Sequence, residues 1–349
     1  MTRMNLDRRG FLAVAAGAAL AGVAQPARAA VTDDTLNQLA ASAARAGSIL
    51  WYESSPRDQI DRVIAAFTQR FPAVRLEHVR DTGGNAMAGR VIQEVQGNTR
   101  TCDVGTNSAS VIWQLVGRNM VERVDWAARG ADARLAPTPF TLLTTASTYV
   151  ILSNSRMVSD ADAPRTWEDL ANPRWREKFG TWIRSEGLTS LAAVWGEDRV
   201  ARYIEQLNAQ RPFLFKSTFP LAQQLAAGEV AVALGIYHTA QPPIRRGAPI
   251  RVTVPDPAAI SSLFSFLPTA GRNKDGGLLL ALWLATPGGA QAYEQATGRG
   301  NYLIEGTETA RLLAGRTVAE FTPDQTERML PILTRFNNML QNGGGREVD

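Results

Sequence analysis

The 349-residue chain has few of the residue types that enzymes most often use for covalent chemistry. It contains one cysteine, Cys102, and two histidines, His78 and His238, which are far apart in the sequence. A lone cysteine excludes an internal disulfide, and the neighbours of Cys102 include no base that would activate a catalytic thiol. Cys102 is therefore predicted to be a small buried residue of a strand.

Several catalytic motifs are also missing. The sequence has no Gly-x-Ser-x-Gly turn, no His-Glu-x-x-His zinc motif and no phosphate-binding loop with its lysine. Because Asp and Glu are plentiful, a carboxylate pair for glycoside hydrolysis stays open as an alternative. We expect a protein that is not an enzyme and needs no cofactor, and turnover of a bound ligand would contradict this.

Lysine is scarce, since only Lys178, Lys216 and Lys274 occur, and arginine carries most of the positive charge. The formal net charge is +4, but residues 1–29 hold four arginines against one aspartate and contribute +3 of it. The rest of the chain, at +1, gives little support for nucleic-acid binding. Arginine also suits bidentate binding of carboxylate or phosphate.

Residues 1–29 are predicted to be an export signal. Arg8 and Arg9 precede an apolar run at 11–23, and Ala27-Arg28-Ala29 has the small-x-small pattern of a cleavage site. The run is too short, and too rich in Ala and Gly, to span a bilayer comfortably, although an uncleaved anchor is the alternative. Residues 7–12 resemble a twin-arginine signal. We therefore expect a periplasmic protein with no stable membrane insertion after cleavage.

Strand and helix patterns alternate on both sides of residues 147–154, Ser-Thr-Tyr-Val-Ile-Leu-Ser-Asn. Large apolar residues bounded by small polar ones predict a strand buried on both faces. The alternation predicts an α/β fold with mainly parallel sheets flanked by helices, and the chain is long enough for two domains. We expect this strand to lead from one lobe into a second, with the functional cleft between them. A central strand of one domain is the alternative.

Loops at the carboxyl ends of the predicted strands carry hydroxyl and amide side chains. An open α/β sheet receives its ligand at such loops, and helix starts there can hold an anion. The candidate ligand-binding residues are Ser54, Ser55, Thr106, Asn107, Ser108, Arg184, Ser185 and Thr189. Arg184 is the first choice for the ligand's charged end, because its loop combines a cation, hydroxyls and a helix start. For each hydroxyl, simple capping of its own helix is the alternative.

Several stretches together resemble the periplasmic substrate-binding proteins of ABC importers, in the branch of the ferric-iron and aminoethylphosphonate-type receptors. They include residues 50–55 (Leu-Trp-Tyr-Glu-Ser-Ser), 149–154, 164–170 (Pro-Arg-Thr-Trp-Glu-Asp-Leu) and 225–232 (Leu-Ala-Ala-Gly-Glu-Val-Ala-Val). The resemblance covers almost the whole chain after residue 29. It implies the type II periplasmic binding fold, in which two lobes joined by two hinge crossings close on a ligand. Lobe I would comprise residues 30–148 and 258–349, and lobe II residues 149–257.

The resemblance also implies a monomeric receptor that delivers a small-molecule ligand to an ABC permease, and it places Tyr237 in the cleft. Iron-binding relatives often have two adjacent tyrosines here, and Ile236 replaces the first. Because a site with one phenolate binds Fe³⁺ weakly, we expect an organic anion of carboxylate or phosphonate type. Iron held by Tyr237 is the alternative, and otherwise no metal is expected. A sensor subunit for a membrane kinase is an alternative of another class.

Overall fold

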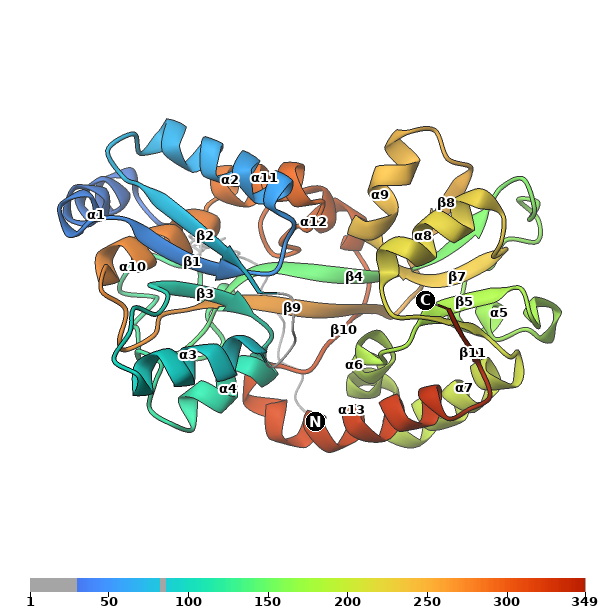
Figure 1. The fold of residues 1–349 in the computed structure, drawn as a ribbon. Helices are drawn as coiled ribbons and strands as arrows, with labels where there is room; N and C mark the ends of the chain where they lie inside the picture. Colours follow the sequence, from blue (N-terminus) through green and yellow to red (C-terminus); the bar gives the residue numbers. More distant parts are fainter. Residues whose placement is uncertain (1–29, 82–85, 349) are drawn as a thin grey trace, which may run out of the picture.

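The computed structural model describes residues 30–81 and 86–348, so the predicted export signal at 1–29 lies outside the described residues. Within these ranges, helices cover both faces of one mixed sheet (Figure 1). The main strand order is β11-β6-β5-β7-β4-β9-β3-β1-β2, while β8 pairs with β4 and β10 with β9. None of the described helices combines the length and the hydropathy that a membrane span requires.

The first half of the chain forms one end of this sheet. Its elements are α1 (Asp33–Ala46), β1 (Ile49–Glu53), α2 (Arg57–Arg70), β2 (Leu76–Arg80), α3 (Ala86–Gln96), β3 (Val104–Asn107) and α4 (Ala109–Val116). β1 pairs in parallel with both β2 and β3, as the strand-helix alternation predicted. Ile60, Val63 and Phe67 form one buried stripe of α2, so this helix packs onto the sheet.

The predicted pivot strand is confirmed as β4 (Leu142–Asn154), although it begins five residues earlier than expected. All of its residues are buried. Its first part, residues 142–148, pairs with β9 (Ala258–Phe266). Its second part, from residue 149, pairs with β7 (Val232–Ile236) and β8 (Ile250–Thr253). One strand therefore carries the chain from the first half of the sheet into the second.

The second half begins after β4 and repeats the strand-helix alternation. Its further elements are α5 (Trp167–Leu170), β5 (Phe179–Trp182), α6 (Glu186–Trp195), α7 (Glu197–Ala209), β6 (Phe213–Phe215), α8 (Thr218–Ala227) and α9 (Tyr237–Arg245). β5 pairs in parallel with β6 and β7. Thr166 caps α5, and Asp169 completes a capping box with it.

The chain returns to the first half through β9, and residues 250–253 just before it form β8, which pairs with β4. The elements that follow are α10 (Lys274–Leu284), α11 (Pro287–Thr297) and α12 (Glu308–Leu313). α10 packs against α1, and α11 packs against α2. Thus segments from both ends of the sequence build the first half.

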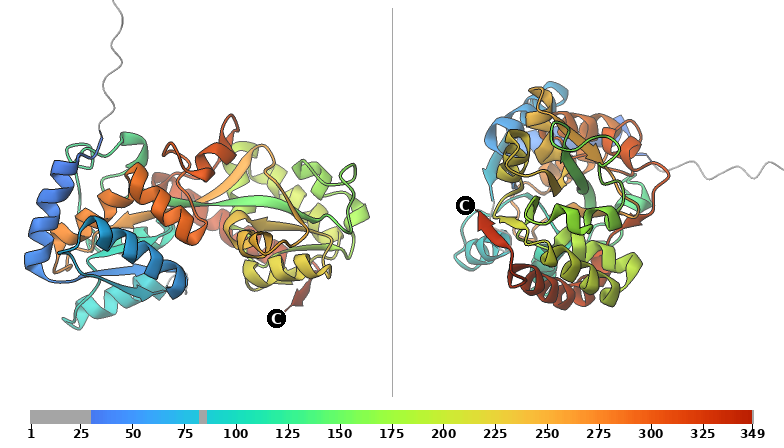
Figure 2. Two further views of the ribbon diagram at one scale, coloured as in Figure 1. Left: turned by 90° about the horizontal axis from the view of Figure 1, so that it is seen from above. Right: turned by 90° about the vertical axis from the view of Figure 1, so that its right-hand side faces the viewer.

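The apolar cores of the two halves are separate. One buried cluster joins Trp51, Phe67 and Trp283 with their neighbours from the first half and from α10 and α11. Two others, one of which includes Trp167 and Phe179, belong mainly to the second half. Seen from above, the two halves lie side by side with β4 running between them (Figure 2). The molecule is therefore two-lobed, as expected for the fold class.

The C-terminal segment lies against the second lobe, although residues 258–349 were assigned to the first. Ile332, Phe336 and Leu340 of α13 (Thr326–Gln341) are buried in the same cluster as Trp167. β11 (Arg346–Val348) pairs in parallel with β6, so the end of the described chain also packs on the second lobe. The chain reaches α13 by a third crossing, through β10 (Val318–Ala319) on β9.

Candidate functional site

The carboxyl end of β1 holds a fully buried carboxylate, that of Glu53. The backbone N–H of Ser55 donates to Glu53 Oε2 at 2.6 Å, and the Ser55 hydroxyl donates to Oε1 at 3.0 Å. The phenol of Tyr293, which α11 brings from the far end of the sequence, donates to Oε1 at 2.9 Å. Buried charge needs such donors, so the loop after β1 is tied to α11.

Arg299 extends this arrangement toward the second lobe. Gly298, at a φ of +76°, ends α11 in the left-handed conformation, and Arg299 follows it directly. Its Nη1 donates to the hydroxyls of Ser54 and Ser55, each at 3.3 Å, and lies 3.5 Å from Glu53 Oε1. These contacts explain how Ser54 and Ser55, two of the predicted site residues, come to face a cation.

His238 is the contact of Arg299 in the second lobe. Arg299 Nε donates to His238 Nε2 over 3.1 Å. His238 is the second residue of α9 and is buried, with its ring edge-on to Phe219. Burial, and next the charge of Arg299, hold the pKa of His238 well below its usual range, so the imidazole is neutral and accepts the hydrogen bond.

We call this set the interlobe cluster; its members are Glu53, Ser54, Ser55, His238, Tyr293 and Arg299. Its one cation is partly accessible, since the Arg299 side chain is 16% exposed. The third guanidinium nitrogen, Nη2, has no hydrogen-bond partner among the described residues. Where the two lobes meet, the cluster therefore offers guanidinium N–H groups that no described residue accepts.

Tyr237, the predicted tyrosine of the cleft, lies next to His238 at the start of α9. Its hydroxyl donates to the carboxylate of Glu308, at the start of α12. Burial first, and then Glu308, raise the pKa of Tyr237, so the phenol keeps its proton. A protonated phenol is a poor ligand for Fe³⁺. The described ranges also contain no group of three or more His, Cys, Asp or Glu side chains placed to hold a metal.

The predicted anion-binding loop before α6 is filled by the chain's own groups. The backbone N–H and hydroxyl of Ser185 donate to Asn337 Oδ1 of α13, at 2.8 and 3.0 Å. Thr189 is buried and lies 3.3 Å from the Ser185 hydroxyl. Arg184 forms an ion pair with Glu186 and stacks over the Trp182 ring at 4.9 Å. These three predicted residues therefore have internal partners.

Tyr149 of β4 connects this loop with the interlobe cluster. Its ring covers Gly187 so closely that an added Cβ would lie 2.3 Å from it. Burial and then Glu186 raise the pKa of Tyr149, whereas Arg184 and Arg299 act in the opposite direction. A small cavity is lined by Tyr149, Trp182, Arg184 and neighbouring residues.

The loop at the end of β3 holds three further predicted residues, Thr106, Asn107 and Ser108. Each of them has a hydrogen-bond partner within the chain. Thr106 is buried and accepts a hydrogen bond from Trp51 Nε1 at 3.0 Å. Asn107 Oδ1 accepts from the Ser108 N–H at 2.8 Å, and the Ser108 hydroxyl lies 3.0 Å from that of Ser110. Within the described ranges, no hydrogen bond joins these three residues to the interlobe cluster.

Sequence reasoning missed three members of the interlobe cluster as site residues: His238, Tyr293 and Arg299. Glu53 was noticed only as part of a turn. The signal for Arg299 was the triplet Gly298-Arg299-Gly300 directly after a helix, because flanking glycines indicate a tight turn that displays one side chain. The partners of Arg299 are 61 and 246 positions away, so no local pattern could join them.

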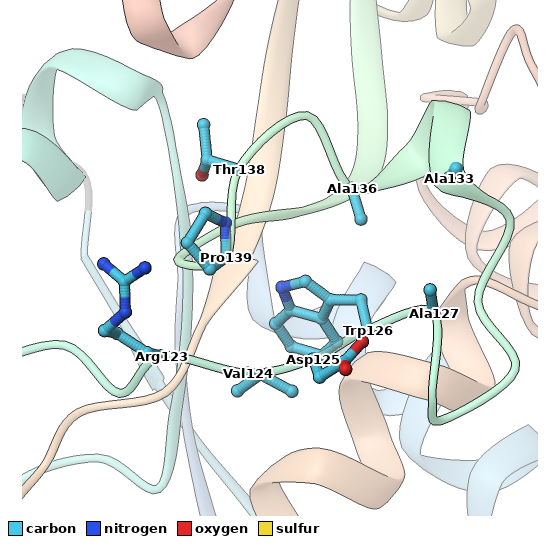
Figure 3. Close-up of a pocket in the computed structure, with 9 residues that line it drawn as sticks. All are labelled: Arg123, Val124, Asp125, Trp126, Ala127, Ala133, Ala136, Thr138 and Pro139. Atoms are coloured by element: carbon cyan, nitrogen blue, oxygen red, sulfur yellow. The ribbon is translucent and has the colours of Figure 1, made fainter.

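A second concave region lies on the first lobe. It has a volume of about 470 Å³ and is lined by residues between Arg123 and Pro139, with the Trp126 ring at the centre of the lining residues (Figure 3). The indole N–H of Trp126 is buried without a partner. This pocket shares no residue with the interlobe cluster. We place the candidate site at the cluster, because charged and polar groups from both lobes converge there.

A family model described as a bacterial extracellular solute-binding protein matches residues 117–293. A curated protein of Haemophilus influenzae, described as uncharacterized, is 27% identical over 102 residues. That match covers 27% of this chain and 29% of the relative, so the chain matches less than a third of that protein's length.

Solved structures with a similar fold include the substrate-binding protein of an ABC transporter from Agrobacterium tumefaciens, with a TM-score of 0.70 and 14% identity over 86% of this chain and 97% of that one. Iron-bound HitA from Pseudomonas aeruginosa has a TM-score of 0.68 and 13% identity, with coverage of 83% and 99%. AfuA from Actinobacillus pleuropneumoniae, with bound fructose-6-phosphate, has a TM-score of 0.66 and 16% identity, with coverage of 84% and 99%. At such identities the likeness concerns the fold.

Proposed function

The chain belongs to the bacterial extracellular solute-binding proteins, and from this premise we propose that it is a periplasmic receptor for a small organic anion. The ligand, of carboxylate or phosphonate type, binds in the cleft between the lobes and is delivered unchanged to an ABC permease. The observation that carries the proposal is Arg299, whose guanidinium contacts residues of both lobes and whose Nη2 has no acceptor among the described residues. The protein acts as a monomer and catalyses no reaction.

The chemistry of the interlobe cluster favours an anion. A guanidinium beside two serine hydroxyls offers charge-assisted hydrogen bonds to carboxylate or phosphonate oxygens. Because Arg299 of the first lobe is also hydrogen-bonded to His238 of the second, a ligand held by Arg299 would stabilise the closed arrangement over the open one. A permease can distinguish the closed, ligand-bound state from the open state, and ligand binding can in this way be coupled to transport.

Ferric iron is the weaker candidate. Its support is the fold shared with iron-bound HitA. Against it, Ile236 stands where a second tyrosine would lie, and Tyr237 is a protonated phenol engaged by Glu308. A sensor subunit for a membrane kinase would bind the same ligand and differ only in its partner, so co-purification with a permease or a kinase separates these two alternatives.

A thermal-shift experiment tests the ligand class. Protein purified from the periplasm is heated with succinate, methylphosphonate, inorganic phosphate, putrescine or ferric citrate. We expect an organic anion to raise the melting temperature, because a ligand of the native state at a hundredfold its Kd adds about 2.7 kcal/mol to stability. Stabilisation by the iron complex alone, or by putrescine alone, would contradict the proposal.

Export is tested separately with the double substitution Arg8→Lys and Arg9→Lys. The twin-arginine route requires the arginine pair, so we expect the unprocessed precursor to accumulate in the cytoplasm. Continued export of the double variant would contradict the twin-arginine route, and it would leave the ligand-binding proposal untouched.

A further inference from the structure

We propose that Arg299, and not Arg184, is the cation that binds the ligand's anionic group, and that this group is singly charged. The inference rests on the proposed function and names the residue that would decide ligand specificity. It differs from the sequence-based expectation, which gave this role to Arg184 because of its loop.

The positive charge of Arg184 is already neutralised. Glu186, two residues away, pairs with it and lies in the first turn of α6, where a negative charge is favourable. The Arg184 side chain is also 47% exposed, so solvent screens it. The Ser185 N–H, a further donor before this helix, is occupied by Asn337. An incoming anion would therefore meet the charge of Glu186 beside Arg184, and it would lose the Ser185 N–H as a donor.

The charge of Arg299 is only partly neutralised. Its one carboxylate neighbour in the cluster is Glu53, at 3.5 Å, a long separation for an ion pair. The oxygens of Glu53 already accept hydrogen bonds from Ser55 and Tyr293. Since the Arg299 side chain is 16% exposed, its field is weakly screened toward the cluster. A ligand anion would thus find an attractive potential here.

The guanidinium of Arg299 is held in a fixed orientation. Nε is engaged by His238 of the second lobe, and Nη1 by Ser54 and Ser55 of the first. Anchors on two nitrogens fix the plane of the group, so the N–H groups of Nη2 have a defined direction before the ligand arrives. Such preorganisation lowers the entropic cost of binding.

The charge balance of the cluster sets the charge of the ligand group. Arg299 contributes one positive charge, Glu53 one negative charge, and His238 is neutral. Arg184 and Glu186 cancel one another nearby. Because at most one positive charge, that of Arg299, is left partly uncompensated, a dianionic group would be poorly balanced. A carboxylate therefore suits the cluster better than a fully ionised phosphonate.

Four variants of the full chain, purified from the periplasm, test the inference by isothermal titration with succinate and methylphosphonate. We expect Arg299→Gln to weaken succinate binding about 30-fold or more, and Arg299→Lys about tenfold, because Lys keeps the charge but loses the planar fork. Arg184→Gln should have a smaller effect than either. Arg62→Gln is the matched control, because Arg62 donates to the Ala296 carbonyl of α11, outside the cluster.

Folding of each variant is checked by its urea midpoint. If Arg299→Gln fails to fold because Glu53 is left unpaired, the double variant Glu53→Gln with Arg299→Gln restores the charge balance and carries the test. A loss of succinate affinity in Arg184→Gln but not in the Arg299 variants would overturn this inference and leave the proposed function standing. A preference for the methylphosphonate dianion at high pH would overturn the charge assignment. No response of the wild type to any anion would overturn the proposed function itself.

Discussion

Glu53 shows how one residue makes the first lobe depend on groups far away in the sequence. Its carboxylate is fully buried, and a buried charge is tolerated only where donors replace water. Tyr293 supplies one of these donors from a position 240 residues away. The same hydrogen bonds that stabilise the fold therefore also orient the serines that face Arg299.

Tyr293→Phe removes one donor to this buried charge. Hydrogen bonds to charged groups contribute more than neutral ones, so we expect a loss of about 1.5–3 kcal/mol in the free energy of unfolding. Tyr203→Phe is the matched control, because the buried Tyr203 hydroxyl donates at 2.8 Å to a neutral acceptor, the carbonyl of Trp167. That change should cost about 1 kcal/mol. Urea denaturation measures both, and equal losses would mean that Glu53 carries no charge.

Gly187→Ala tests the packing of Tyr149 over the start of α6. The new methyl group would lie 2.3 Å from the Tyr149 ring, so the ring must move. Overpacking of this kind costs about 1–3 kcal/mol. The control is Gly89→Ala in α3, where an added Cβ meets nothing within 4 Å. Because Ala favours helix, Gly89→Ala should stabilise the protein by about 0.5–1 kcal/mol. A melting temperature unchanged by Gly187→Ala would contradict the close contact.

At the scale of elements, local patterns predicted most helices and strands but not where the last ones pack. The apolar stripe of α2 and the capping box of α5 each depend on residues only a few positions apart, so local patterns are enough to find them. The lobe on which α13 packs is not found in this way, because periodicity indicates which face of a helix is buried but not which part of the protein buries it. β11, with its polar sequence Arg-Glu-Val, gives no strand signal, and only its pairing with β6 makes it one.

The candidate site was predictable only in part, because contacts between residues far apart in the sequence also decide which of its groups are free. Ser54 and Ser55 were found because they follow a strand, the position where an α/β sheet presents its loops. Ser185 and Thr189 occupy an equally favourable position, yet Asn337 from α13 occupies their donor groups. Whether the donors of this loop are free for a ligand therefore depends on a side chain about 150 residues away, and sequence periodicity gives no information about that contact.

Phe336→Ala tests the assignment of α13 to the second lobe. Phe336 is fully buried in the cluster that contains Trp167, so truncation should cost about 3–5 kcal/mol. Hydrogen exchange should speed up in α6 and α7, while β1 and β2 keep their protection. Leu330→Ala, at a 41% exposed position of the same helix, is the control and should change stability by less than about 0.5 kcal/mol. If β1 instead lost its protection before α6 and α7, α13 would belong to the first lobe.

For the whole molecule, three crossings between the lobes define the hinge, and Glu320 lies directly after the third. Its carboxylate accepts from the Ser262 N–H of β9 at 2.9 Å and from the Tyr302 hydroxyl at 3.3 Å. Burial raises the pKa of Glu320 to about 7, which these two hydrogen bonds only partly counteract. The hinge therefore contains an acid that titrates near neutral pH.

This placement makes the stability of the whole molecule depend on pH. The pKa of Glu320 is higher in the folded state than its ordinary value of 4.5, so between pH 4.5 and 7 the folded state binds more protons than the unfolded state. Stability must then fall as pH rises through this window, in total by about 3–4 kcal/mol at 1.4 kcal/mol per pKa unit. Glu320→Gln, which stays neutral, should remove this contribution, so that it gains stability over the wild type at pH 8 and matches it near pH 4.5. Urea denaturation across this range measures the difference, and parallel curves for the two proteins would show that the hinge carboxyl titrates as it does in water.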